Sequence, residues 1–282
     1  MILSTRTKIG LARAVQLLIG TGLRVLSKGP TLNVRRKGIN WNLDLREGID
    51  FAIYLLGSFE PRTLAAYRKL IPGGATVLDV GANIGAHTLH FAQLVGQQGK
   101  VIAVEPTAYA FNRLIENIGL NPSLARRIEA MQSMLMSTLE ADLVEEIPSS
   151  WPLVTPEGAH AHHGGVKKST KGATIITVDH LIKKLAINKL DFVKLDVDGY
   201  EVEVLRGAVG TLSQHSPVIL FEHSPYTIAE KGYEPMEMIE IMRTLGYRFE
   251  FLGGNRVPDN GLTPPKIPAG AGINLVARRA TG

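Results

Sequence analysis

The sequence predicts an α/β fold: a mostly parallel, Rossmann-like sheet with helices on both faces and an antiparallel edge strand. Three observations support this prediction. Short apolar, β-branched runs alternate with segments of helical spacing between residues 76 and 245. A glycine-rich turn joins the first of these strands to its helix. The last two expected strands, 247–252 and 273–277, have no helix between them, so they should pair antiparallel.

An N-terminal cap is expected over residues 1–72 and a main domain over 73–282, because the Pro-Gly-Gly sequence at 72–74 marks a boundary. Charged residues interrupt the apolar ones within 1–28, which predicts an amphipathic helix rather than a signal peptide or a membrane span. Two interpretations of this helix stay open. It packs on the domain, or it rests as a basic helix on a membrane surface.

The other elements follow from hydrophobic period and from the positions of glycine and proline. We expect a hairpin at 31–45, strands at 76–80, 101–104, 128–135, 173–178, 191–197, 217–221, 247–252 and 273–277, and helices at 48–56, 61–70, 85–95, 108–118, 138–146, 178–185, 199–212 and 234–245. A segment rich in proline, glycine, histidine and lysine, 148–172, is expected to form a long loop.

Composition narrows the class of protein. The 282 residues are 45% hydrophobic and 20% charged, as in ordinary folded chains, and the lack of cysteine excludes disulfides, thiolate metal sites and a cysteine nucleophile. We therefore expect a cytoplasmic protein, with membrane association through residues 1–28 as the alternative. The net charge of +5 is spread along the chain, and no basic run resembles a nucleic-acid patch. The sequence carries no signal for an oligomeric state.

The turn after the first strand is expected to be the floor of a cofactor site. Asp79 ends that strand, and Gly81 and Gly85 let the backbone bend sharply and approach a ligand. In an open α/β sheet, ligands bind at the carboxyl ends of the strands. Glu105 closes the second strand, where its two oxygens can accept hydrogen bonds from the hydroxyls of a ribose.

The glycine pattern separates the candidate cofactors. It lacks the three glycines of a dinucleotide fingerprint, and no phosphate-binding loop is present. A cofactor with a ribose and an adenine but no phosphate fits better, and S-adenosylmethionine is such a cofactor. Asp79 would hold the turn or the methionine ammonium, and Gly81 would let the methionine part pass close to the backbone.

The chain resembles the FkbM family of S-adenosylmethionine-dependent methyltransferases over about residues 75–251, through motifs at 78–85, 104–106, 193–201 and 219–222. The resemblance implies a class I methyltransferase fold and O-methylation of a sugar, polyketide or related metabolite, without fixing the acceptor. It also implies that the following residues bind the cofactor: Asp79, Gly81, Asn83, Gly85, Thr88, Glu105 and Pro106.

A second group of polar residues closes two later strands. Lys194 lies in one of them and Asp196 and Asp198 close it, and Glu222 and His223 follow the next. Methyl transfer to a hydroxyl requires an in-line approach and removal of a proton by a base or by a metal that acidifies the oxygen. Asp196 and His223 are the candidate bases, and Lys194 and Asp198 are further catalytic candidates.

Alternative roles for these residues stay open. Asp196, Glu222 and His223 could hold a divalent cation such as Mg²⁺, an arrangement that resembles the metal-dependent catechol-type O-methyltransferases. Lys194 and Asp196 could form only a supporting ion pair, and Asp198 could only cap the next helix.

The expected loop at 148–172 contains His160, His162 and His163, which we interpret as polar residues over the acceptor site, with a metal tract as the alternative. The sequence as a whole predicts methyl transfer from S-adenosylmethionine to a hydroxyl of a small-molecule or glycan acceptor. The alternatives are a catalytically inactive S-adenosylmethionine-binding module and a nicotinamide-dependent oxidoreductase.

Overall fold

The computed structural model describes residues 31–153, 164–258, 262, 267 and 271–279. The helix expected within 1–28 and the three histidines at 160, 162 and 163 lie outside the described residues. Among the described residues, no helix combines the length and the apolar character that crossing a bilayer requires.

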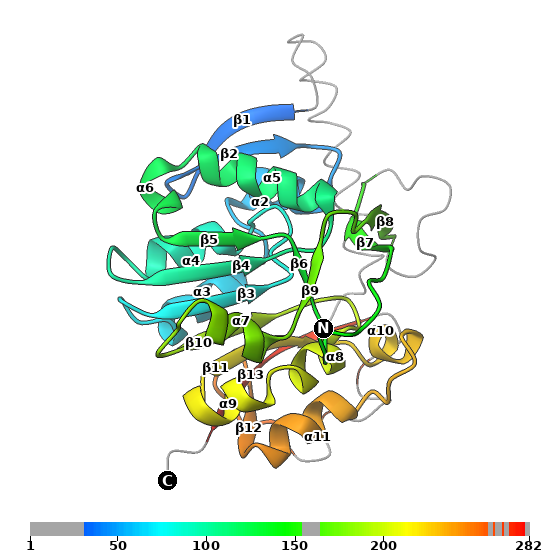
Figure 1. Cartoon of the computed structure of the whole chain (residues 1–282). Coiled ribbons are helices and arrows are strands. Elements are labelled where there is room, and N and C mark those ends of the chain that lie inside the picture. The colour runs from blue at the N-terminus through cyan, green and yellow to red at the C-terminus, as the bar shows by residue number, and fades with distance from the viewer. Residues whose placement is uncertain (1–30, 154–163, 259–261, 263–266, 268–270, 280–282) are drawn as a thin grey trace.

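A seven-stranded sheet forms the centre of the fold (Figure 1). Its order is β12 (Tyr247–Phe251), β13 (Ile273–Arg279), β11 (Val218–His223), β10 (Phe192–Leu195), β3 (Thr76–Val80), β4 (Lys100–Val104) and β5 (Ile128–Met131). The sequence correctly predicts a mostly parallel sheet and antiparallel pairing of the last two strands. This antiparallel pair lies at one edge of the sheet, where β13 lies between β11 and β12 and is antiparallel to both.

Helices cover both faces of the sheet, and strand alternation gives each face its own apolar cluster. On one face, Leu78 and Val80 pack with α7 (Val178–Lys184), α8 (Glu201–Arg206), α9 (Val209–His215) and α11 (Glu237–Thr244). On the other face, Val77 and Phe192 pack with α3 (Pro61–Leu70) and α4 (Thr88–Leu94). The same alternation decides which polar residues can share a site.

The N-terminal cap packs on this second face. The predicted hairpin is present as β1 (Thr31–Arg36) and β2 (Ile39–Asp44), and it is followed by α2 (Gly48–Leu56) and α3. Trp41 and Tyr67 of the cap are fully buried in one cluster with Val77 and Phe192 of the sheet. Cap and sheet therefore share a hydrophobic core, although the boundary at residue 72 stays a prediction.

Asparagine side chains attach the hairpin to α5 (Ala108–Gly119) and α6 (Pro122–Ala125). The backbone N–H of Asn42 donates to Asn117 Oδ1 at 2.9 Å, and that of Asn40 donates to Asn121 Oδ1 at 2.9 Å. Asn117 Nδ2 donates in turn to the carbonyl of Ile84 at 3.0 Å. These side chains accept hydrogen bonds from backbone N–H groups on the unpaired edge of β2, and they connect this strand to the glycine-rich turn.

The segment between residues 128 and 172 departs most from the prediction. The strand expected at 128–135 is two strands, because β6 (Ser133–Leu135) leaves the sheet to pair with β9 (Thr174–Ile176). The prediction of a helix at 138–146 is wrong. Thr170 donates to the carbonyls of Val144 and Glu145, which therefore serve a tertiary contact rather than a helix. Part of the expected loop is a hairpin of β7 (Glu146–Ser150) and β8 (Val166–Ser169).

Two helices also differ from expectation. The helix expected at 199–212 is broken into α8 and α9 around Gly207, where a Cβ atom would lie 2.2 Å from the carbonyl oxygen of Met136. A short helix, α10 (Pro225–Glu230), was not predicted and follows β11 at the rim of the sheet.

Replacing Asn117 by alanine should destabilise the fold. Asn117 is 1% exposed, and its loss leaves the N–H of Asn42 and the carbonyl of Ile84 without partners. Each such group costs about 1 to 3 kcal/mol, so chemical denaturation should show a clear loss of unfolding free energy. Glu116→Ala, at the exposed neighbouring position, is the matched control. Equal stability of the two variants would contradict this role of Asn117.

Candidate active site

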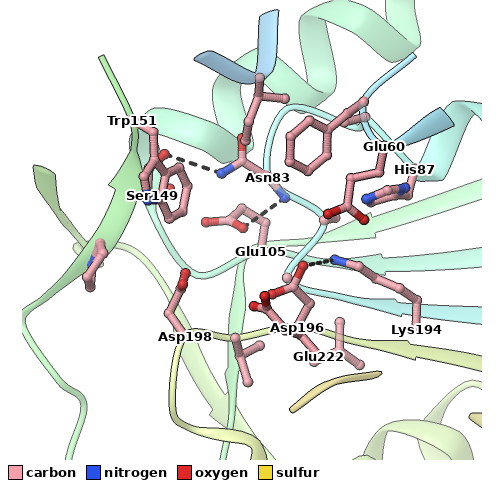
Figure 2. Close-up of a pocket in the computed structure, with 18 of the residues that line it drawn as sticks. Glu60, Asn83, His87, Glu105, Ser149, Trp151, Lys194, Asp196, Asp198 and Glu222 are labelled. Carbon is pink, nitrogen blue, oxygen red and sulfur yellow. Dashed lines mark hydrogen bonds and ion pairs between the residues drawn. The ribbon is translucent and has the colours of Figure 1, made fainter. Parts of the chain in front are cut away.

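A cavity of about 590 Å³ opens at the carboxyl ends of β3, β4, β10 and β11. Its walls come from the glycine-rich turn, the segment after β4, residues 133–135, the β7 region, the end of β10 and helix α2. This is the crevice in which open α/β sheets bind their ligands. Figure 2 shows how its polar side chains converge.

The glycine-rich turn is built by close backbone packing. Gly81 has a φ of 80°, and a Cβ atom there would lie 2.0 Å from the carbonyl oxygen of Asp196. Gly85 has a φ of 89°, and a Cβ atom there would lie 2.9 Å from Leu114 Cδ1. The turn occupies residues 81–87, so α4 begins at Thr88 rather than at the expected residue 85.

Asp79 and Thr88 stand behind the turn, and neither lines the cavity. Thr88 Oγ1 donates to Asp79 Oδ2 at 2.6 Å, and both residues are fully buried. Burial raises the pKa of Asp79, against the opposing effects of Lys194 and Thr88. The geometry therefore favours the turn-holding role of Asp79 over a contact with the methionine ammonium.

Glu105 lines the cavity beside the turn, as the sequence predicts, and so does Pro106. Oε2 of Glu105 accepts from the backbone N–H of Asn83 at 3.0 Å. Oε1 of Glu105 accepts from the N–H and hydroxyl of Thr107 at 3.0 and 2.6 Å. Burial raises the pKa of Glu105, and the hydrogen bonds from Thr107 and Asn83 lower it in part. The carboxylate is thus fixed in place, and Oε2, which accepts from one donor here, can accept further from a diol.

The hairpin region around β7, part of the loop expected over the acceptor site, forms a wall of the cavity, and its contact with the glycine-rich turn was not anticipated from the sequence. Asn83 Nδ2 donates to the carbonyl of Ser149 at 3.2 Å, and the hydroxyls of Thr107 and Ser149 are 2.7 Å apart. On the cap side, the backbone N–H of Trp151 donates to Glu47 Oε2 at 3.1 Å. These contacts hold β7 against both the turn and α2, so the wall and the glycine-rich turn form one structure.

Lys194 and Asp196 meet on the far side of the cavity, with Nζ and Oδ2 3.0 Å apart (Figure 2). The lysine side chain is 5% exposed and the aspartate side chain 32%. Burial lowers the pKa of Lys194, but the carboxylates of Asp196 and Asp79 outweigh it, so the pKa is raised. Lys194 is therefore a fixed cation, and Asp196 presents a carboxylate to the cavity.

Three more carboxyl groups line this side of the cavity: Glu60, Asp198 and Glu222. Burial and the neighbouring carboxylates raise the pKa of Asp198 and of Glu222 well above the ordinary values. Glu201 does not line the cavity. It accepts from the N–H of Val197 at 3.1 Å, and burial raises its pKa to about 7.

His223 does not reach the cavity, so its predicted role as base is not supported by the structure. Adjacent residues of a strand point to opposite faces, and Glu222 takes the cavity side of β11. The buried ring of His223 lies 3.2 Å from the carbonyl of Leu262.

The predicted metal set of Asp196, Glu222 and His223 is therefore not assembled. Within the part of the chain that the structure describes, no three or more His, Cys, Asp or Glu side chains are grouped so that they could hold a metal ion.

Two cavity residues come from positions that sequence reasoning did not single out. Glu60 of the cap lies in the left-handed region with a φ of 49°, an arrangement that costs about 1 to 3 kcal/mol and tends to occur at functional sites. His87 lines the cavity with Nδ1 3.2 Å from the Tyr67 hydroxyl. Burial lowers the pKa of His87 well below its ordinary value, so the ring is neutral.

Comparisons with known proteins find similarity to methyltransferases. A family model described as the methyltransferase FkbM domain matches residues 79–249. Methyltransferase sdnD of Sordaria araneosa is 28% identical over 161 residues, 49% of this chain and 61% of that protein. Hexuronic acid methyltransferase AglP of Haloferax volcanii is 30% identical over 184 residues, 64% of this chain and 66% of that protein. The chain thus spans less than two thirds of either curated relative's length.

A solved structure of methyltransferase FkbM from Methylobacillus flagellatus KT aligns with a TM-score of 0.43 and 14% identity. That alignment covers 76% of this chain and 50% of the other.

Replacing Gly81 by alanine should distort the turn. The left-handed backbone alone costs about 1 to 2 kcal/mol for a residue with a Cβ atom, and the contact with the Asp196 carbonyl adds to it. Thermal unfolding should show a lowered midpoint for Gly81→Ala. Gly73→Ala is the control, because nothing lies within 4 Å of a Cβ atom there. An unchanged midpoint for Gly81→Ala would contradict the packing described for the turn.

Proposed function

This chain belongs to the FkbM methyltransferase family, and on that premise we propose that it moves a methyl group from S-adenosylmethionine to a hydroxyl of a sugar, glycan or other small metabolite. The observation that carries the proposal is the shape of one cavity. The glycine-rich turn with Glu105 forms one wall, and the Lys194–Asp196 pair forms the adjoining wall. A donor and an acceptor can therefore lie between the two walls.

The donor half fits S-adenosylmethionine, which supplies a methyl group on a positively charged sulfur. Glu105 accepts from the ribose hydroxyls, since its carboxylate is fixed and lines the cavity. Pro106, Met134 and Leu135 offer an apolar surface for adenine. The backbone from Gly81 to Asn83 runs beside the methionine part, where positive φ values let it approach closely.

The acceptor half orients a hydroxyl. Asp196, held in place by the buried ammonium of Lys194, accepts a hydrogen bond from a neighbouring hydroxyl of the acceptor. Asp198 lines the same wall and, with a raised pKa, can donate a hydrogen bond to a neighbouring oxygen of the acceptor. Positioning of this kind is the larger part of catalysis for a transfer between two bound molecules.

A sugar hydroxyl is the favoured acceptor. One relative, at 30% identity, is named a hexuronic acid methyltransferase, and cavities lined by carboxylates and hydroxyls suit polyhydroxylated ligands. The family match favours methyl transfer over the nicotinamide-dependent oxidoreductase. A cytoplasmic location and a membrane contact through residues 1–28 remain expectations from the sequence.

Removing the Glu105 carboxylate should weaken S-adenosylmethionine binding. Two hydrogen bonds to a charged group contribute about 1.5 to 3 kcal/mol each, so Glu105→Ala should lower the affinity by on the order of 100-fold or more in calorimetry. Thr107→Val is the matched control, because it removes one donor to Glu105 and keeps the carboxylate. An affinity of Glu105→Ala equal to that of the control would sink the ribose assignment.

The transfer itself can be tested with methyl-labelled S-adenosylmethionine and a panel of methyl glycosides and polyketide-type alcohols. We expect labelled ether products from at least one acceptor. We also expect EDTA to leave the rate unchanged, because Glu222 and His223 point to opposite faces of the sheet. Product formation lost on adding EDTA and restored by Mg²⁺ would contradict that geometry. Binding of the donor with no product from any acceptor would support an inactive binding module.

A further inference from the structure

Glu60 is a residue of the cap that faces the reaction side of the cavity. It lies just before α3 and lines the same cavity as Gly81 and Asp196. In Figure 2 its carboxylate lies on the side of the cavity where Lys194 and Asp196 meet. Glu60 is thus placed near the wall assigned to the acceptor rather than the ribose wall at Glu105.

One oxygen of Glu60 is fixed and the other is available to a ligand. Thr63 Oγ1 and Asn274 Nδ2 both donate to Oε2, at 3.0 and 2.9 Å. Within the described residues no hydrogen bond to Oε1 is found, although Glu60 lines the cavity. Two donors on one oxygen hold the carboxylate in a single orientation. The second oxygen can then receive a hydrogen bond from a bound molecule.

We propose that Glu60 is the general base that takes the proton of the acceptor hydroxyl. This inference rests on the proposed function. The acceptor O–H bond breaks and its proton passes to Glu60 Oε1, while the oxygen forms a bond to the methyl carbon. The carbon–sulfur bond breaks, and its electron pair stays on sulfur, which becomes a neutral thioether. The products are a methyl ether and S-adenosylhomocysteine, and Glu60 returns the proton to water.

The other carboxyl groups of this wall are less suited to the task. Asp196 is already paired with Lys194 at 3.0 Å, so the buried ammonium occupies its Oδ2. Asp198 and Glu222 lie among like charges that favour their protonated forms, in which they cannot accept a proton. Glu60 differs from all three, because it lines the cavity and its Oε2 is held by the neutral donors Thr63 and Asn274 rather than by a cation.

Some of the groups that face Glu60 raise its pKa, and others lower it. Burial and the carboxylate of Asp196 raise the pKa of Glu60 above its ordinary value of 4.5, and the ammonium of Lys194 lowers it. Glu222 and the Tyr67 hydroxyl interact with it as well. On balance the pKa of Glu60 is raised, so Glu60 is a stronger base than an exposed glutamate. Protonation of Glu60 at acid pH should therefore remove the methyl-transfer activity.

Glu60→Gln is the direct test, because the amide keeps the shape and still offers an oxygen to Thr63 and Asn274. With methyl-labelled S-adenosylmethionine and an acceptor from the panel, kcat should fall about 100- to 10,000-fold. The affinity for S-adenosylmethionine in calorimetry should stay within about threefold of wild type. The acid limb of the pH profile of kcat/KM should disappear, whereas Glu60→Asp should recover part of the rate.

Glu129→Gln serves as the control for a lost carboxylate, since Glu129 pairs with Lys100 away from the cavity and the variant should behave as wild type. An active Glu60→Gln enzyme with an unchanged pH profile would overturn the role of Glu60 and leave the proposed function standing. A large loss of S-adenosylmethionine affinity in Glu60→Gln would also overturn it, by showing a cofactor contact. A wild type that binds the donor but methylates no acceptor would overturn both.

Discussion

The contact between Gly81 and the backbone carbonyl of Asp196 joins the two halves of the site. A Cβ atom at Gly81 would lie 2.0 Å from that oxygen, so the end of β3 and the end of β10 can pack this closely only with glycine at this position. The contact brings the turn that lies beside Glu105 close to the wall that carries Lys194 and Asp196. A donor and an acceptor held by the two walls would then be close enough to react.

Strand alternation decides which polar groups enter the cavity. Asp79 and Lys194 are register partners in β3 and β10, and Glu222 and Asn274 are partners in β11 and β13. Lys194, Glu222 and Asn274 all line the cavity, on the face of the sheet that the cap covers. The cap therefore contributes more than stability. Because it shares its apolar core with the sheet, it holds Glu60 at a fixed place opposite these residues.

The sequence was most informative where function follows from local geometry. The glycine turn, Glu105 and Asp196 could be placed because each lies at the carboxyl end of a predicted strand, which is the end that faces the ligand. His223 was misassigned because a shift of one residue along a strand changes the face. Glu60 was missed as a site residue because its partner Asn274 is 214 positions away, and no local pattern reports such a contact. The missing helix at 138–146 has the same cause, since tertiary bonds to Thr170 override local preference.

The central claim is that one cavity holds the donor against Glu105 with its sulfur directed at the wall of Asp196 and Glu60. A crystal structure of the protein with S-adenosylhomocysteine tests it most directly. The account predicts both ribose hydroxyls within hydrogen-bond distance of the Glu105 carboxylate and the sulfur atom facing Asp196 and Glu60. A nucleoside bound elsewhere, or a sulfur atom directed away from those two carboxylates, would contradict it.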